Sequence, residues 1–183
     1  MIPAARPGGV GHNGAMALLR SGVDAHTKAE LTQLLGHPPR PLASGRSPEG
    51  PVVGLLDRLV YRTVDGWSQL AWHEVERGGW DAETGRLRWT NTAGEAVELD
   101  LPKPGRLPQL FNERVTATII CTEILPLAGS HSAVISARRN LAQPDAPLIW
   151  KVSPGIDTTA EQVVDDQLVA VELERLRSEF DRG

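Results

Sequence analysis

The feature that most constrains the fold is a series of short extended runs between Val52 and Ser153, each closed by turn-forming residues. Runs of this length, rich in β-branched and aromatic residues and bounded by Gly, Pro or Asp, are typical of antiparallel strands. Asp65-Gly66 predicts one hairpin, and Glu83-Thr84-Gly85 predicts a second. Gly78-Gly79 predicts a break or bulge between them. The chain is therefore expected to be α+β and mostly β.

Two helices are expected among and after these strands. The segment "GRLPQLFNERV" predicts a short helix with its apolar side inward, formed by Leu107, Leu110 and Phe111. After the last strand, Thr158 and Glu161 form a capping box, and apolar residues then recur at helical spacing as far as Phe180. The sequence predicts one long amphipathic helix there.

Residues 1–51 are expected to be an extension of a domain that spans residues 52–183. Much of the extension is dense in Gly and Pro, which disfavours a packed core. One short helix is predicted near residues 28–35, because Thr27 and Glu30 make a capping box. This helix is expected either to pack on its own domain or to dock on a partner protein. Its apolar stripe consists of Leu31, Leu34 and Leu35.

Residues 72–90 hold three of the five tryptophans. Large rings on paired strands stabilise a sheet through burial and cross-strand contact. We therefore interpret Trp72 and Trp89 as core residues, with His73 on a solvated strand face. An exposed aromatic platform that stacks a ligand is the alternative. Trp67, beside the first hairpin turn, is predicted to be the most exposed of the five.

About seven strands followed by one amphipathic helix resemble a pleckstrin-homology-like domain. The resemblance implies a partly closed antiparallel barrel, capped at one end by the C-terminal helix. More narrowly, the chain resembles an uncharacterised actinobacterial family of hypothetical proteins. This second resemblance covers about residues 52–180 and implies no catalytic residue. It depends on the segments "WHEVERGGWD", "LPQLFNERVTATI" and "ISARRN".

Charge and composition disfavour several classes of function. The net charge is −4, and no basic stripe of the kind that binds nucleic acid is visible in the sequence. No run approaches the ~20 apolar residues of a membrane-spanning helix. No apolar run follows Arg6, as a signal peptide would require. With Cys121 as the single cysteine, no intrachain disulfide is expected, and a cytoplasmic location is predicted.

No sequence motif indicates catalysis, a metal or a cofactor. Cys121 is flanked by isoleucines, which favours a buried apolar role over that of a nucleophile. The glycine-rich stretch "GGVGHNG" has neither the preceding strand nor the following lysine of a phosphate-binding loop. We therefore expect no catalytic residue, no metal and no cofactor. The histidines, none of which has the spacing of a metal site, are His12, His26, His37, His73 and His131.

Two groups of side chains are candidate binding sites. Arg62 and Trp67 lie at the first hairpin, where a single arginine beside an aspartate disfavours phosphoinositides, although peripheral membrane contact through Trp67 stays open. A second group would converge if the short helix lies over the strand "SARRN", and paired guanidinium groups suit an acidic peptide or a phosphate. This group consists of Arg114, Arg138 and Arg139, with Lys103 and Arg106.

The sequence supports three hypotheses about function. The first is a non-enzymatic adaptor or regulatory domain that binds another protein or a peptide, through a groove beside the C-terminal helix or an exposed strand edge. The second is a domain that binds a small molecule or an anion. The third is an enzyme whose site leaves no recognisable motif. Neither a nucleic-acid partner nor an integral membrane location is expected.

Overall fold

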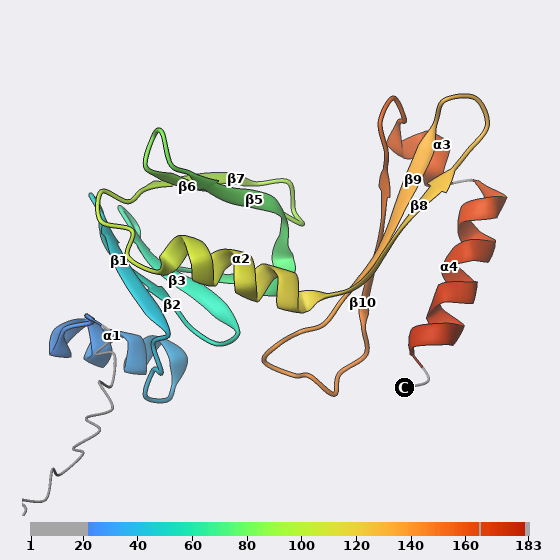
Figure 1. Cartoon of the computed structure of the whole chain (residues 1–183). Helices are drawn as coiled ribbons and strands as arrows, with labels where there is room; N and C mark the ends of the chain where they lie inside the picture. The colour runs from blue at the N-terminus through green and yellow to red at the C-terminus, as the bar shows by residue number, and fades with distance from the viewer. Residues whose placement is uncertain (1–21, 165, 182–183) are drawn as a thin grey trace, which may run out of the picture.

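The structure is a computed structural model that describes residues 22–164 and 166–181. It has two lobes (Figure 1), and the last helix of the first lobe runs directly into the first strand of the second. We call residues 22–118 the N-terminal lobe and residues 119–181 the C-terminal lobe. The stretch "GGVGHNG" and His12 lie outside the described residues.

The fold is α+β and mostly β, with three antiparallel sheets. The helices are α1 (Ala25–Leu35), α2 (Leu107–Thr118), α3 (Ala160–Val164) and α4 (Gln167–Phe180), with one 3-10 turn, η1 (Trp72–Glu74). The strands are β1 (Ala43–Ser47), β2 (Gly50–Gly54), β3 (Arg58–Thr63), β4 (Gly66–Ala71), β5 (Val75–Asp81), β6 (Arg86–Asn91), β7 (Ala96–Asp100), β8 (Ile119–Pro126), β9 (Ser132–Arg138) and β10 (Ile149–Pro154).

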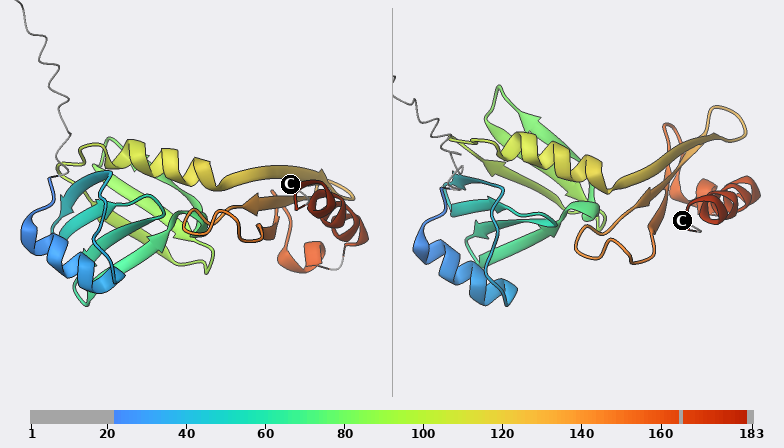
Figure 2. Two further views of the ribbon diagram at one scale, coloured as in Figure 1. Left: turned by 90° about the horizontal axis from the view of Figure 1, so that it is seen from below. Right: turned by 60° about the horizontal axis from the view of Figure 1, so that its bottom comes forward.

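In the N-terminal lobe, two sheets pack face to face (Figure 2). One has the order β1-β2-β3-β4 and the other β5-β6-β7. Both predicted hairpins are confirmed, as β3–β4 and β5–β6. Strand β4 does not continue directly into β5, because η1 breaks the extended backbone at Trp72 and β5 joins the second sheet. The short helix α2 adds Leu107, Leu110 and Phe111 to the core between the sheets, as predicted.

The core role of Trp72 and Trp89 is confirmed, since their exposed fractions are 0% and 3%. The ring of Trp72 meets that of Phe111 edge-on at 5.9 Å between centroids, and its Nε1 donates to the backbone oxygen of Leu55 at 3.1 Å. Trp89 meets Tyr61 edge-on at 5.4 Å. Such contacts add about 0.5–1.5 kcal/mol each to the stabilisation from burial alone.

Helix α1 covers the outer face of the first sheet. It begins at Ala25 because Asp24 caps it: Asp24 Oδ1 accepts from the backbone N–H of Thr27 at 2.8 Å. Gly36 ends it with a left-handed conformation (φ 75°), which glycine adopts easily. The expected domain boundary after residue 51 is wrong, because it falls inside β2, and α1 and β1 are integral to the N-terminal lobe.

The C-terminal lobe is a three-stranded sheet, β10-β9-β8, with α3 and α4 on one face. Ala133 and Ile135 of β9 pack there against Val163, Val169 and Leu176 of the helices. The single long helix predicted from the sequence is instead two. A reciprocal cap between Thr159 and Gln162 precedes α3, and the side chain of Asp166 accepts from the backbone N–H of Leu168 to start α4.

The partly closed barrel that the resemblance implies is not seen in the described part of the chain, where the strands form no closed barrel. The strands divide into three open sheets, and α4 lies on the face of its own small sheet rather than over the end of a barrel. The physical reason is α2, whose apolar side fills the space between the first two sheets and whose last residue leads away into β8. No helix among the described residues is long and apolar enough to cross a membrane.

Candidate functional site

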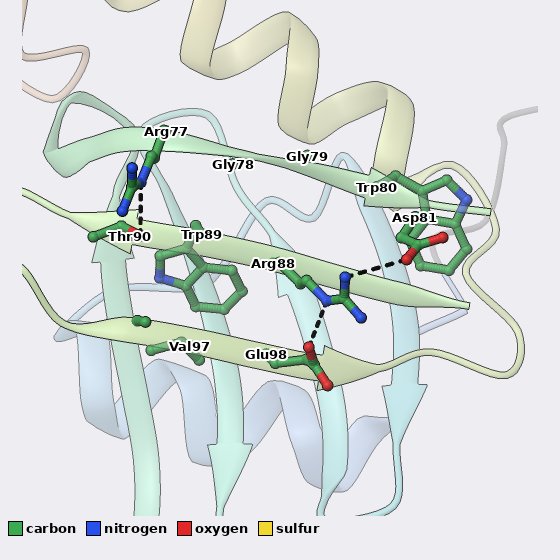
Figure 3. A pocket seen from close by; sticks show the side chains of 11 residues that line it. Arg77, Gly78, Gly79, Trp80, Asp81, Arg88, Trp89, Thr90, Val97 and Glu98 are labelled. Atoms are coloured by element: carbon green, nitrogen blue, oxygen red, sulfur yellow. Dashed lines mark hydrogen bonds and ion pairs between the residues drawn. The ribbon is translucent and has the colours of Figure 1, made fainter. Parts of the chain in front are cut away.

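A shallow hollow of about 540 Å³ lies on the outer face of the β5-β6-β7 sheet (Figure 3). All three strands contribute to it, and the opposite face of this sheet is the core face that carries Leu87 and Trp89. The residues at the hollow include Arg77, Gly78, Gly79 and Asp81 of β5, Arg88 and Thr90 of β6, and Ala96 and Glu98 of β7.

The two adjacent glycines of β5 have different structural roles. A Cβ at Gly78 would lie 2.5 Å from the backbone oxygen of Arg88 and 2.8 Å from the Cβ of Trp89, so the fold itself needs glycine there. A Cβ at Gly79 would meet no atom within 4 Å, and the backbone there does not have the positive φ that favours glycine. Packing therefore does not require glycine at position 79, and the missing side chain there leaves the floor of the hollow open.

The rim of the hollow is charged. Arg88 forms ion pairs with Glu98 and with Asp81, the latter at 3.2 Å, and Figure 3 shows its side chain turned toward these two acids. Arg77 donates from Nε to Thr90 Oγ1 at 3.3 Å, and no carboxylate of the described residues lies within 4.0 Å of its guanidinium. Arg77 is therefore the cation of this rim that is left for a ligand.

Asp81 fixes one end of the hollow. Its Oδ1 accepts from the backbone N–H groups of Glu83 and Thr84 at 3.0 and 3.2 Å, which closes the β5–β6 turn. Hydrogen bonds from Thr84 lower the pKa of Asp81, with smaller contributions from Glu83 and Arg88. The carboxylate is thereby held charged and in place beside Arg88.

Arg62 and Trp67 lie together, as the sequence suggested, but they contact each other and the protein's own helix α1. The Arg62 guanidinium lies 5.3 Å from the centroid of the Trp67 ring and 3.6 Å from Glu30 Oε1 on α1. Trp67 packs on the buried cluster beneath α1 and is half-buried, like Trp80 and Trp150. It therefore does not stand out as the exposed tryptophan that the sequence predicted.

Of the basic residues named from the sequence, Lys103, Arg138 and Arg139 line three different hollows. Arg114 is half-buried on α2, Arg139 is exposed just after β9, and Lys103 lines a different hollow beside α1 and β1. Arg138 is half-buried on β9, where its Nη1 donates to Thr118 Oγ1 at 3.0 Å. The hydrogen bond between Arg138 and Thr118 joins β9 to the last turn of α2.

The leucine stripe of α1 is used by the protein's own core. Leu31 is fully buried against Val53 and Val60 of the first sheet, and Leu35 packs on the same cluster. Leu34 is 37% exposed. The alternative in which the helix packs on its own domain therefore accounts for Leu31 and Leu35.

The geometry of the described residues disfavours both a metal site and a reactive thiol. Within residues 22–164 and 166–181, no group of three or more His, Cys, Asp or Glu side chains could hold a metal ion. Cys121 is half-buried on β8, and burial is the main cause of its raised pKa, which keeps the thiol protonated.

Sequence reasoning missed Arg77 and Gly79 as site residues. The available signal was the pair of glycines within a strand, which can mark a place where another molecule approaches closely. Only the structure separates Gly78, which the packing of Trp89 requires, from Gly79, which it does not.

Comparisons with known proteins give no relative. No family model matches the sequence, and neither a curated protein nor a solved structure matches it. The resemblance to an actinobacterial family therefore stays a prediction.

Proposed function

We propose that the protein is a non-enzymatic interaction module that binds a short segment of a partner protein across the outer face of β5-β6-β7. An aromatic side chain of the partner lies over Gly79, and a neighbouring acidic side chain pairs with Arg77. The observation that carries the proposal is the open floor at Gly79, which the packing of the chain does not require.

The size and shape of the hollow support this occupant. Its volume of about 540 Å³ exceeds what a single aromatic side chain fills, and it is shallow rather than enclosed, as suits one ring with its flanking backbone. The aliphatic part of Arg77 and the methyl group of Ala96 give it apolar edges. A planar guanidinium also stacks favourably on an aromatic face.

The charge around the hollow supports the acidic neighbour. The carboxylates of Asp81 and Glu98 are already paired with Arg88, so a basic partner would have to break these pairs. Arg77, by contrast, offers a guanidinium with no carboxylate near it among the described residues. A carboxylate that arrives there gains charge-assisted hydrogen bonds without displacing another.

The test is a selection of random twelve-residue peptides displayed on phage against the full chain. The enriched sequence is then labelled, and its affinity is measured by fluorescence anisotropy. We expect enriched sequences to place Asp or Glu beside Phe, Tyr or Trp. Gly79→Val fills the floor and should weaken binding at least about tenfold, and Arg77→Gln should weaken it by a similar factor.

Ala29→Val is the matched control, because Ala29 is exposed on α1, far from the hollow. It should leave the affinity unchanged. Enriched sequences without an acidic and aromatic pair would overturn the proposal. So would equal affinities of the Gly79→Val and Ala29→Val variants.

A further inference from the structure

A second cavity lies between the two lobes and is independent of the β5-β6-β7 hollow. It measures about 550 Å³ and is lined from both lobes. The N-terminal lobe contributes His73 of η1 and Glu76 of β5, and the C-terminal lobe contributes the face of its sheet that is turned away from α3 and α4. We call this cavity the interlobe cleft. Its volume is within the range of small-molecule sites.

Arg138 brings an incompletely paired cation into the interlobe cleft. Its guanidinium is half-buried and donates to Thr118 Oγ1, yet no carboxylate of the described residues lies within 4.0 Å of it. Burial lowers the pKa of Arg138, which Glu76 only partly offsets. A charge withdrawn from water without an ionic partner is unfavourable, so an anion that binds here regains this energy.

His73 supplies an unused polar atom opposite. Its Nδ1 is buried and has no hydrogen-bond partner among the described residues. The sequence predicted a solvated strand face for His73, which is wrong, because His73 belongs to the 3-10 turn that precedes β5. Burial is the main cause of its lowered pKa, so the neutral ring can donate from one nitrogen and accept at the other.

The rest of the interlobe cleft divides into a charged end and an apolar wall. Lys151 lies 2.9 Å from Glu76 Oε1, and this ion pair joins β10 to β5 across the cleft. Val134 of β9 and Ile149 of β10 share the cleft face with Arg138, because Ile149 lies opposite Arg138 in the sheet. An occupant therefore meets the incompletely paired guanidinium of Arg138 and, next to it, the aliphatic side chains of Val134 and Ile149.

We propose that the interlobe cleft binds a small organic anion, whose carboxylate or phosphate group pairs with Arg138 and reaches His73, and whose apolar body packs on Val134 and Ile149. The ligand bridges the two lobes, since His73 and Arg138 belong to different ones. Carboxylate and phosphate present the same acceptor chemistry to a guanidinium, and the probes below distinguish them.

The test is isothermal titration calorimetry of the full chain with three probes: 4-phenylbutyrate, phenyl phosphate, and the uncharged 4-phenylbutyramide. One or both anions should bind with one-to-one stoichiometry, and at least about tenfold more tightly than the amide. Tighter binding of phenyl phosphate assigns the site to a phosphate group, and tighter binding of 4-phenylbutyrate assigns it to a carboxylate.

Arg138→Met keeps an unbranched apolar stem but removes the guanidinium group and its charge, so it should abolish the preference for the anion. Arg139→Met is the matched control, because Arg139 is the next residue, is exposed, and lines a different hollow. Ile149→Glu provides a second test that does not remove a half-buried side chain: it adds a negative charge to an exposed position in the cleft and should also prevent anion binding.

The proposal is overturned if neither anion binds more tightly than the amide. It is equally overturned if Arg138→Met and Ile149→Glu retain the binding of wild type, or if Arg139→Met weakens binding as much as Arg138→Met. Failure of this test does not bear on the peptide site proposed in the β5-β6-β7 hollow, because the peptide assay depends on other residues.

Discussion

The ammonium group of Lys151 lies 2.9 Å from Oε1 of Glu76, so that an ion pair links β10 of the C-terminal lobe to β5 of the N-terminal lobe. Both side chains are about one-third exposed, at 35% and 36%. Exposed pairs of this kind contribute little, because solvent screens the charges and two long side chains lose freedom. The lobes are joined more firmly by the direct passage from α2 into β8.

We therefore predict a small coupling between these two side chains. A double-mutant cycle with Lys151→Met and Glu76→Gln, followed by urea unfolding, should give a coupling free energy below about 1 kcal/mol. A coupling of about 2 kcal/mol or more would contradict this account and would mean that the pair is a principal connection between the lobes.

The two glycines of β5 should respond oppositely to alanine. Gly78→Ala forces a methyl group against the backbone of Arg88 and the side chain of Trp89, and should lower the free energy of unfolding by about 1–3 kcal/mol. Gly79→Ala should be neutral or stabilise the fold by up to about 1 kcal/mol, because it restricts the unfolded chain. Urea unfolding of both variants checks this. Equal losses would show that the hollow is a requirement of packing.

The leucines of α1 should also differ in how much stability their replacement by alanine costs. Leu31→Ala leaves a cavity beneath the helix and should cost about 2–5 kcal/mol in the free energy of unfolding. Leu34→Ala, on the more exposed side, should cost less than about 1 kcal/mol. Guanidinium unfolding measures both. If Leu31→Ala were as mild as Leu34→Ala, α1 would not be docked on the first sheet.

His73 should make stability depend on pH. Its pKa in the folded protein is lowered, by burial first and then by Arg138 and Arg58, while Glu74 and Asp57 act in the opposite direction. The unfolded chain therefore takes up the proton more readily. The contribution of His73 is fully present above about pH 6.5 and is lost as pH falls toward the lowered pKa.

The check is urea unfolding of wild type and His73→Gln at pH 7.5 and pH 5.5. Wild type should lose more stability between these two values than the variant. Equal losses would mean that His73 is not buried against the C-terminal lobe in solution.

The local elements were largely predictable from the sequence. The hairpin turns, the inward side of α2 and the glycine that ends α1 follow from short-range rules of turn chemistry and periodicity. Such rules act over a few residues, and packing did not override them. The burial of Trp72 and Trp89 was predictable for a related reason, since rings of that size dominate the area that a sheet can bury.

The assembly of the strands was not predictable in the same way. Whether β4 continues into β5 depends on Trp72, whose burial against Phe111 comes with a tight turn rather than an extended backbone. Whether the last helix is one or two depends on Asp166, which caps α4 in competition with a continuous helix. These outcomes depend on contacts between distant residues, which periodicity does not encode.

The candidate sites depended on the same distant contacts. Gly79 differs from Gly78 only through the position of Trp89 on the neighbouring strand. Arg138 differs from Arg139 only because its side chain lies on the side of the sheet that faces the N-terminal lobe. In each case two identical neighbours in the sequence acquire different roles, which no reading of a single sequence can separate.

The most direct test of the proposed peptide site is a nuclear magnetic resonance titration. The full chain, labelled with ¹⁵N, is titrated with the selected acidic and aromatic peptide, and the backbone amide shifts are mapped. The account predicts that the largest changes fall on Arg77, Gly78 and Gly79, with smaller ones on Thr90 and Ala96 across the sheet. Changes confined to α1, to α4 or to the interlobe cleft, with the amide of Gly79 unmoved, would contradict it.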